Sequence, residues 1–176
     1  MRLRIRFTKH GKVRFTSHRD VARIWERVVR RAQLPVAYSE GFNPRVKLSF
    51  GLALSTGHES EAEYIDIDLV PERAGGVDVD ALRQLLTELL PEGMTATAVG
   101  ITDRRGPSLQ QAVTSCTWRI DVADIDVETA AGAVARALAA ESLVVTRERK
   151  GRRSPTTSAP WCSASTSMGR WKTVSG

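Results

Sequence analysis

The sequence predicts an α+β protein: a ferredoxin-like split βαβ domain with an extra leading hairpin strand, followed by an incomplete second βαβ unit. Two patterns support this prediction. Apolar residues alternate with charged ones over residues 2–7, the period of a half-buried strand, and similar segments recur later. Longer segments between them carry apolar residues at helical spacing. In chain order the segments run strand, strand, helix, strand, strand, helix, strand.

The chain opens with a predicted β-hairpin. Leu3, Ile5 and Phe7 alternate with arginines. The apolar residues of 13–15 repeat the pattern after a loop whose Gly11 suits a positive φ. Because like charges opposite each other destabilise a sheet, we expect an anion to neutralise the other face. That face carries Arg2, Arg4, Arg6 and Arg14.

A helix is predicted after Ser17, whose hydroxyl can cap it, with Asp20 in the place of the usual Glu or Gln of a capping box. Leu34-Pro35 ends this helix. Its apolar stripe comprises Val21, Ile24, Trp25, Val28 and Ala32. Another face carries the arginines Arg19, Arg23, Arg27 and Arg30.

The remaining elements of the first domain, residues 1–103, follow the loop over residues 39–44. Strands are predicted over Arg45–Ser55 and Ala62–Val70, a helix over Asp78–Leu90 and a strand over Met94–Ile101. Residues 104–112 are predicted to be a polar linker. The partial second βαβ unit, residues 113–152, comprises a strand over Thr114–Val122, a helix over Asp126–Ala140 and a strand over Leu143–Glu148.

Residues 153–176 form an irregular tail in which small polar residues dominate and no periodicity is found. One interpretation is a disordered tail. The other is a frameshift: with GC-rich codons, reading the same bases one position along restores strand-like alternation. The second interpretation predicts that the tail is out of frame and that the second unit is truncated.

Positive charge is concentrated near the N-terminus. Residues 1–50 contain 13 Lys and Arg against three acids, a net charge of +10, so the rest of the chain carries −4 of the total of +6. Such segregation is typical of a surface that binds a polyanion. No apolar run approaches the roughly 20 residues of a membrane span. The alternating N-terminus is unlike a secretory signal, so we expect a cytoplasmic protein.

Neither a metal nor a cofactor is expected. Cys116 and Cys162 are far apart, with no Cys or His at ligand spacing. The acids between residues 59 and 68 alternate as on a solvated strand face and lack a cage of further ligands.

Three segments resemble one family: R-F-T-S-H-R-D at 14–20, A-Y-S-E-G-F-N-P-R-V-K-L-S-F at 37–50 and S-E-A-E-Y at 60–64. It is the uncharacterised domain associated with radical SAM proteins. The resemblance covers residues 1–152 and departs at Arg153. It implies partnership with a radical SAM enzyme and a role in RNA metabolism, and it implies no catalytic residue. An iron–sulfur cluster of that enzyme class commonly needs three clustered thiolates, which two distant cysteines do not supply.

Two groups of residues are candidates for binding. The first is a phosphate-tracking surface, with RNA as the expected ligand because ferredoxin-like sheets commonly bind single strands. The alternative for these cations is a solvated face that pairs with acids of the same chain, either in its acidic second half or at Glu61, Glu63, Asp66 and Asp68. The predicted nucleic-acid-binding residues are Arg2, Arg4, Arg6, Arg14, Arg19, Arg23, Arg27, Arg45 and Lys47. The predicted substrate-loop residues are His18, Gly41, Asn43 and Glu63.

The sequence therefore predicts a non-catalytic RNA-binding or substrate-presenting accessory of a radical SAM RNA-modification or RNA-processing system. Two alternatives remain. One is a protein-docking module for a radical SAM enzyme without nucleic-acid contact. The other is an enzyme in which His18, Asp20 and Glu63 converge on a pocket, although Ser17 and Asp20 are also explained as a helix cap.

Overall fold

The computed structural model describes residues 1–52, 54–75, 78–149 and 152–158. The chain divides into two compact units, Met1–Cys116 and Thr117–Gly176. Among the helices within these ranges, none is both long and apolar enough to cross a membrane.

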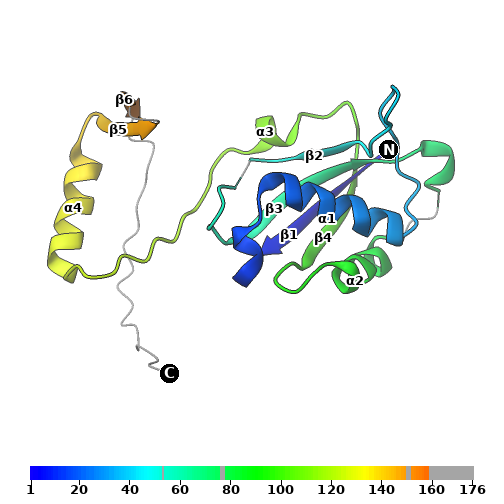
Figure 1. The fold of residues 1–176 in the computed structure, drawn as a ribbon, viewed down its shortest axis with the longest axis horizontal. Coiled ribbons are helices and arrows are strands. Elements are labelled where there is room, and N and C mark those ends of the chain that lie inside the picture. The colour runs from blue at the N-terminus through cyan, green and yellow to red at the C-terminus, as the bar shows by residue number, and fades with distance from the viewer. Residues whose placement is uncertain (53, 76–77, 150–151, 159–176) are drawn as a thin grey trace. The chain divides into compact units, whose positions relative to one another are not determined.

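A four-stranded antiparallel sheet forms the first unit (Figure 1). Its strand order is β2-β3-β1-β4, so the N-terminal strand lies in the middle, paired with β3 on one edge and β4 on the other. The α+β prediction is confirmed. The strands are β1 (Arg2–Lys9), β2 (Leu48–Phe50), β3 (Ser60–Asp68) and β4 (Ala96–Thr102).

Helices α1 (His18–Arg31) and α2 (Val79–Leu89) share one hydrophobic core with the sheet. The apolar side chains that alternate along β1 are buried in this core: Leu3, Ile5 and Phe7. The ring of Phe7 packs edge-on against that of Trp25 of α1, with centroids 5.0 Å apart. The arginine parity of β1 therefore faces away from the helices, because successive strand side chains point to opposite faces.

Part of the opposite face of the sheet is covered by the segment that follows β4. Residues 104–112, predicted to be a linker, include the short helix α3 (Leu109–Ala112). Ser108 and Gln111 form a capping box at its start. Leu109 is buried beside Gly51 and close to β3. This segment thus belongs to the first unit.

The predicted leading hairpin is wrong. Gly11 does adopt a positive φ of 60°, but residues Gly11–Phe15 form a 3-10 helix and Phe15 is exposed. The reason lies in the sheet: a strand has two edges, and those of β1 are occupied by β3 and β4. No edge of β1 remains for a hairpin partner.

Several other predicted boundaries change. The strand predicted over Arg45–Ser55 is reduced to β2, and a second 3-10 helix, Pro71–Arg73, follows β3. The helix predicted over Asp78–Leu90 is α2, with Asp78 as its N-cap.

In the second unit, α4 (Val127–Ala139) precedes an antiparallel hairpin of β5 (Leu143–Arg149) and β6 (Arg152–Ser158). The predicted strand over Thr114–Val122 is wrong: these residues form no regular element. A strand must pair with a neighbouring edge, and β5 pairs with β6 instead. The described part of this unit is thus not a βαβ unit. The tail was predicted to be irregular from residue 153. Residues 153–158 instead belong to β6, and residues 159–176 of the tail lie outside the described ranges.

Candidate nucleic-acid interface

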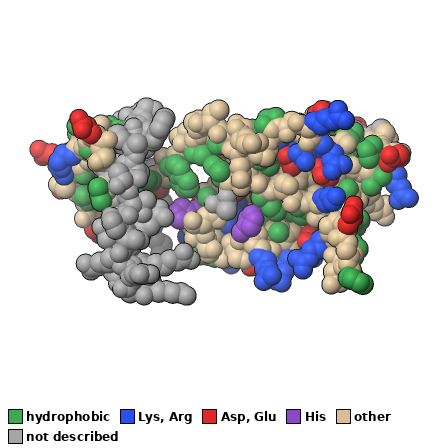
Figure 2. All heavy atoms as spheres, turned by 90° about the horizontal axis from the view of Figure 1, so that it is seen from above, with side chains coloured by type: hydrophobic (Ala, Val, Ile, Leu, Met, Phe, Trp, Pro, Cys, Tyr) green, Lys and Arg blue, Asp and Glu red, His purple; other side chains and the backbone are tan. Residues whose placement is uncertain are grey.

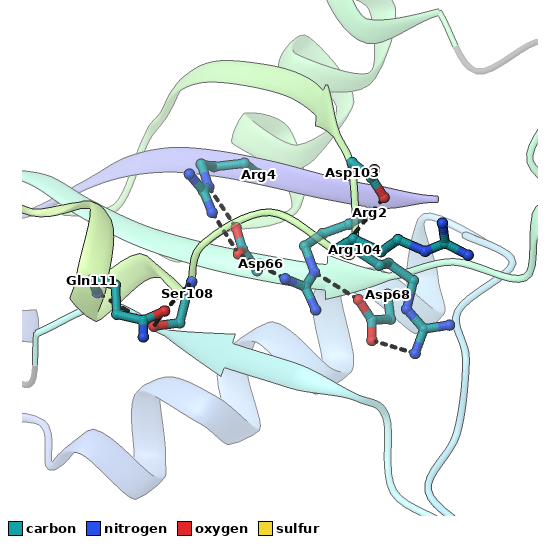
Figure 3. A network of polar contacts seen from close by, with 9 residues as sticks. Arg2, Arg4, Asp66, Asp68, Asp103, Arg104, Ser108 and Gln111 are labelled. Atoms are coloured by element: carbon teal, nitrogen blue, oxygen red, sulfur yellow. Dashed lines mark hydrogen bonds and ion pairs between the residues drawn. The ribbon is translucent and has the colours of Figure 1, made fainter.

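The arginines at the start of β1 are paired with carboxylates of β3 (Figure 3). Arg4 donates from Nε and Nη2 to the two oxygens of Asp66, each at 2.9 Å. Arg2 donates from Nε to Asp68 Oδ1 at 2.8 Å, and its Nη1 lies 3.7 Å from Asp66 Oδ2. Asp66 is only 2 % exposed. Its hydrogen bonds raise the pKa of Arg4 above the usual value, so this guanidinium stays charged.

The strand register explains this pairing. Antiparallel alignment of β1 with β3 places Arg2 opposite Asp68 and Arg4 opposite Asp66. Opposite charges directly across a strand pair stabilise a sheet. These two arginines therefore hold the sheet together, as the same-chain alternative predicts.

Arg14 and Arg6 complete the predicted hairpin face. Arg14 Nη1 donates to Glu59 Oε1 at 3.2 Å, and its guanidinium lies 4.8 Å from the centroid of the Phe15 ring. The backbone N–H of Gly11, together with Arg14, lowers the pKa of Glu59. Arg6 remains exposed, opposite Tyr64 in β3. Of the predicted hairpin face, Arg6 is the member for which no ion pair is found among the described residues.

The arginines of α1 have a different environment. Ser17 caps the helix: its Oγ accepts from the Asp20 N–H at 3.2 Å and donates to Asp20 Oδ2 at 2.6 Å. This bond lowers the pKa of Asp20. The side of the helix that packs on the sheet comprises Val21, Trp25, Val28 and Val29.

At about 100° per residue, the opposite side carries four arginines and spans roughly 16 Å of helix. We call this set the α1 arginine face: Arg19, Arg23, Arg27 and Arg30, all exposed. In the part of the chain that the structure describes, one member has an ion pair, Arg23 with Asp20 at 3.5 Å. Such exposed pairs contribute little stability, so these guanidinium groups are available to an external ligand.

Arg45 and Lys47 are exposed on one arm of a small loop before β2. Backbone hydrogen bonds from Ser39 N to Arg45 O and from Lys47 N to Ala37 O close this loop. Gly41 at its tip has a φ of +124°, a conformation that favours glycine. Beside it Phe42 is fully exposed, and Asn43 is also exposed.

His18 and Glu63 are separate from that loop and line one small cavity together with Lys9. The cavity volume is about 10 Å³, room for roughly one water molecule. Asp20 is not in the lining; its carboxylate accepts a hydrogen bond from Ser17. The structure thus does not assemble His18, Asp20 and Glu63 around a pocket of substrate size. Within the described residues, no three His, Cys, Asp or Glu side chains are grouped to hold a metal ion.

Lys9 was missed by the sequence analysis. It is 3 % exposed, and its Nζ donates to the carbonyl of Thr16 at 3.2 Å. Burial lowers the pKa of this amine, and the charge of Glu63 partly opposes that shift. Lys9 continues the alternation of Leu3, Ile5 and Phe7 along β1, and this position in the sequence could have indicated that it is buried.

Arg104 was also missed: its Nη2 lies 3.3 Å from Asp68 Oδ2, beside Arg2 (Figure 3). The predicted cations therefore do not form a single platform. The α1 arginine face lies on the helix layer, whereas Arg2 and Arg4 lie on the opposite face of the sheet, bound to acids. In Figure 2, Lys and Arg side chains form separate groups with Asp and Glu side chains between them.

Comparison with known proteins gives one match. Residues 2–164 fit the model of a family described as "Uncharacterized protein conserved in bacteria (DUF2344)". No curated protein and no solved structure matches the chain. Because the match spans most of its length, the chain belongs to this family of uncharacterised bacterial proteins.

Proposed function

We propose that this protein binds RNA through the α1 arginine face, as a non-catalytic accessory that presents RNA to a radical SAM modification or processing enzyme. One observation carries the RNA-binding part: exposed guanidinium groups line one side of α1 over three turns with a single weak carboxylate partner among the described residues. Guanidinium groups bind phosphates with paired hydrogen bonds, and several in a row can follow a phosphate backbone.

The first unit is proposed to be a ferredoxin-like split βαβ domain. Its element order, β1-α1-β2-β3-α2-β4, and its strand order support this. RNA is expected on the helix layer, because the sheet face opposite the helices carries the Arg2–Asp68 and Arg4–Asp66 pairs and is partly covered by α3. The radical SAM partner comes from the resemblance in the sequence. RNA as the ligand class comes from that resemblance and from the frequent use of ferredoxin-like domains to bind single-stranded RNA.

A salt titration of binding to a short single-stranded RNA tests the proposal. If the four arginines each neutralise a phosphate, the slope of log affinity against log salt is roughly −3. Arg27→Gln is expected to make that slope shallower by about 0.7, since one released counterion is lost. Arg83→Gln is the matched control, because Arg83 is an exposed arginine of α2 outside the proposed surface. A flat slope, or equal effects of the two variants, would contradict the proposal.

A second candidate is a protein-docking module, and Phe42 favours it. A fully exposed aromatic ring at the tip of a loop resembles the anchors that carry protein interfaces. In the same titration this candidate predicts no RNA binding even at low salt. It also predicts that a radical SAM protein co-purifies with the wild type and is lost with Phe42→Ala, while Arg27→Gln retains it.

The out-of-frame tail remains a hypothesis of the sequence alone. Resequencing the gene across the codons for residues 150–176 tests this hypothesis. A reading frame that encodes these residues unchanged would contradict it.

A further inference from the structure

A hollow lies at the end of the sheet where β1 begins and β4 ends. It is shallow and open to solvent, and Met1, Arg2, Asp103, Arg104 and Arg105 line it. The pairing of Arg2 with Thr102 brings the residues after β4 beside the start of β1. The labelled side chains in Figure 3 show how Arg2, Asp68 and Arg104 lie next to each other there.

Positive charge exceeds negative charge around this hollow. Asp66 is shared between Arg2 and Arg4, and Asp68 between Arg2 and Arg104, so two carboxylates hold three guanidinium groups. Arg105 and Asp103 add one charge of each sign. The group therefore has four cations against three anions. Since both shared carboxylates are almost fully buried, the excess charge is left on the arginines that reach solvent.

The arginines at the hollow retain hydrogen-bond donors. A guanidinium has five N–H groups. Arg104 is about half exposed and uses one nitrogen on Asp68. Arg105 is exposed, and no ion pair is found for it within the described ranges. Arg2 Nε lies 2.8 Å from Asp68 Oδ1, and the Arg2 side chain is only 17 % exposed. The guanidinium of Arg2 is therefore already fixed in place.

We propose that this hollow binds a phosphomonoester group through Arg2, Arg104 and Arg105. A phosphomonoester carries about −1.5 to −2 charges at neutral pH and offers three acceptor oxygens, more than a diester link can present. Resting on the RNA-binding function proposed above, we assign the group to the terminal phosphate of an RNA strand.

The position of the hollow relative to α1 supports that assignment. Pro35, just after α1, accepts a hydrogen bond from Val70 N, and Leu69 N donates to Met1 O. The C-terminal end of α1 and the hollow thus lie at the same end of the first unit. They lie on opposite sides of the sheet, so a strand bound along the α1 arginine face would have to pass around this end of the unit for its terminal phosphate to reach Arg104 and Arg105.

The test compares one short single-stranded RNA in three forms: hydroxyl at both ends, phosphate at the 5′ end and phosphate at the 3′ end. We expect the wild type to bind one phosphorylated form about tenfold more tightly than the hydroxyl form, equivalent to roughly 1.4 kcal/mol. Arg104→Gln and Arg105→Gln should each reduce this preference while retaining the salt-dependent binding of the hydroxyl form. Arg83→Gln is the matched control and should keep the preference.

The outcomes separate the two proposals. Arg27→Glu tests the α1 arginine face, and we expect this variant to lose binding to all three RNAs. The end preference of Arg104→Gln and Arg105→Gln tests the hollow separately. Inorganic phosphate, titrated alone and followed by the amide NMR signals of Arg104 and Arg105, distinguishes the source. Phosphate binding that is lost in Arg105→Gln, without any end preference, would overturn the RNA terminus as the source and retain a phosphomonoester site. Neither binding nor preference would overturn the site.

Discussion

The arginines of β1 and those of α1 come from equally regular patterns, yet they meet opposite environments. On β1, each of Arg2 and Arg4 faces an aspartate across the strand pair, and Asp66 is nearly inaccessible to water. On α1, the arginines point away from the core, and Arg23 alone has a carboxylate within ion-pair distance among the described residues.

The difference teaches that a basic run in a sequence does not by itself indicate a binding surface. Cross-strand neighbours decide whether a cation is used within the fold. A helix face directed at solvent has no such neighbour, so its cations remain available. The comparison can be challenged by changing one member of each region and measuring stability.

The largest effect is expected for Arg4→Met. It leaves the buried carboxylate of Asp66 with only the distant Nη1 of Arg2, so the free energy of unfolding should fall by about 3 kcal/mol. Urea unfolding monitored by circular dichroism measures this. In the double variant Arg4→Met/Asp66→Leu, no buried charge is left without its partner at this pair, and much of the loss should be recovered. An unchanged unfolding midpoint in Arg4→Met would show that the pair is not structural.

A smaller effect of opposite sign is expected for Lys9→Met. Here a buried cation has a carbonyl as its partner instead of a carboxylate, so an apolar side chain of similar length should stabilise the fold by roughly 1 kcal/mol at neutral pH. In the folded state the pKa of Lys9 lies below the ordinary 10.5. Between these two values the unfolded chain binds more protons, so wild-type stability rises with pH.

The difference in free energy of unfolding between Lys9→Met and wild type should therefore become smaller as the pH approaches 10.5 from below. Comparing the two proteins at each pH cancels the titration of all other groups. A wild type that is more stable than the variant at neutral pH, or a gap that stays constant with pH, would contradict the interpretation of Lys9 as a destabilising buried cation.

The smallest effect is expected for Arg27→Gln, whose free energy of unfolding should stay within about 0.5 kcal/mol of wild type. Its side chain is exposed and has no ion pair among the described residues, so nothing in the fold depends on its charge. The same urea experiment measures it beside Arg4→Met. A loss approaching that of Arg4→Met would erase the distinction between the two regions.

Local patterns in the sequence were enough to predict α1, α2 and the α1 arginine face. The stripe from Val21 to Val28 and the cap at Ser17 lie within one helix, so spacing alone defines which side is buried. The structure keeps that arrangement. The mixed α+β class followed from the same kind of reasoning.

Strand pairing could not be predicted in this way, because partners are distant in the chain. The pattern at Val13–Phe15 is strand-like, yet β3 and β4 occupy both edges of β1. The neutralisation of Arg4 depends on a register with Asp66, sixty-two residues away. The proximity of Arg104 to Arg2 likewise requires knowing that β4 pairs with β1. The residues predicted to form a substrate loop are divided by the fold for the same reason: Gly41 and Asn43 lie in the loop before β2, whereas His18 and Glu63 line the small cavity.

The central position of β1 also bears on how this protein is made. Roughly a hundred residues separate Arg2 from its partner Thr102 in β4. At about 5–20 residues per second, a ribosome needs on the order of 5–20 s to supply that partner. Meanwhile Leu3, Ile5 and Phe7 have emerged without the sheet that buries them. The nascent chain therefore exposes a hydrophobic segment around Leu3, Ile5 and Phe7, and we expect chaperones that act at the ribosomal exit tunnel to bind it.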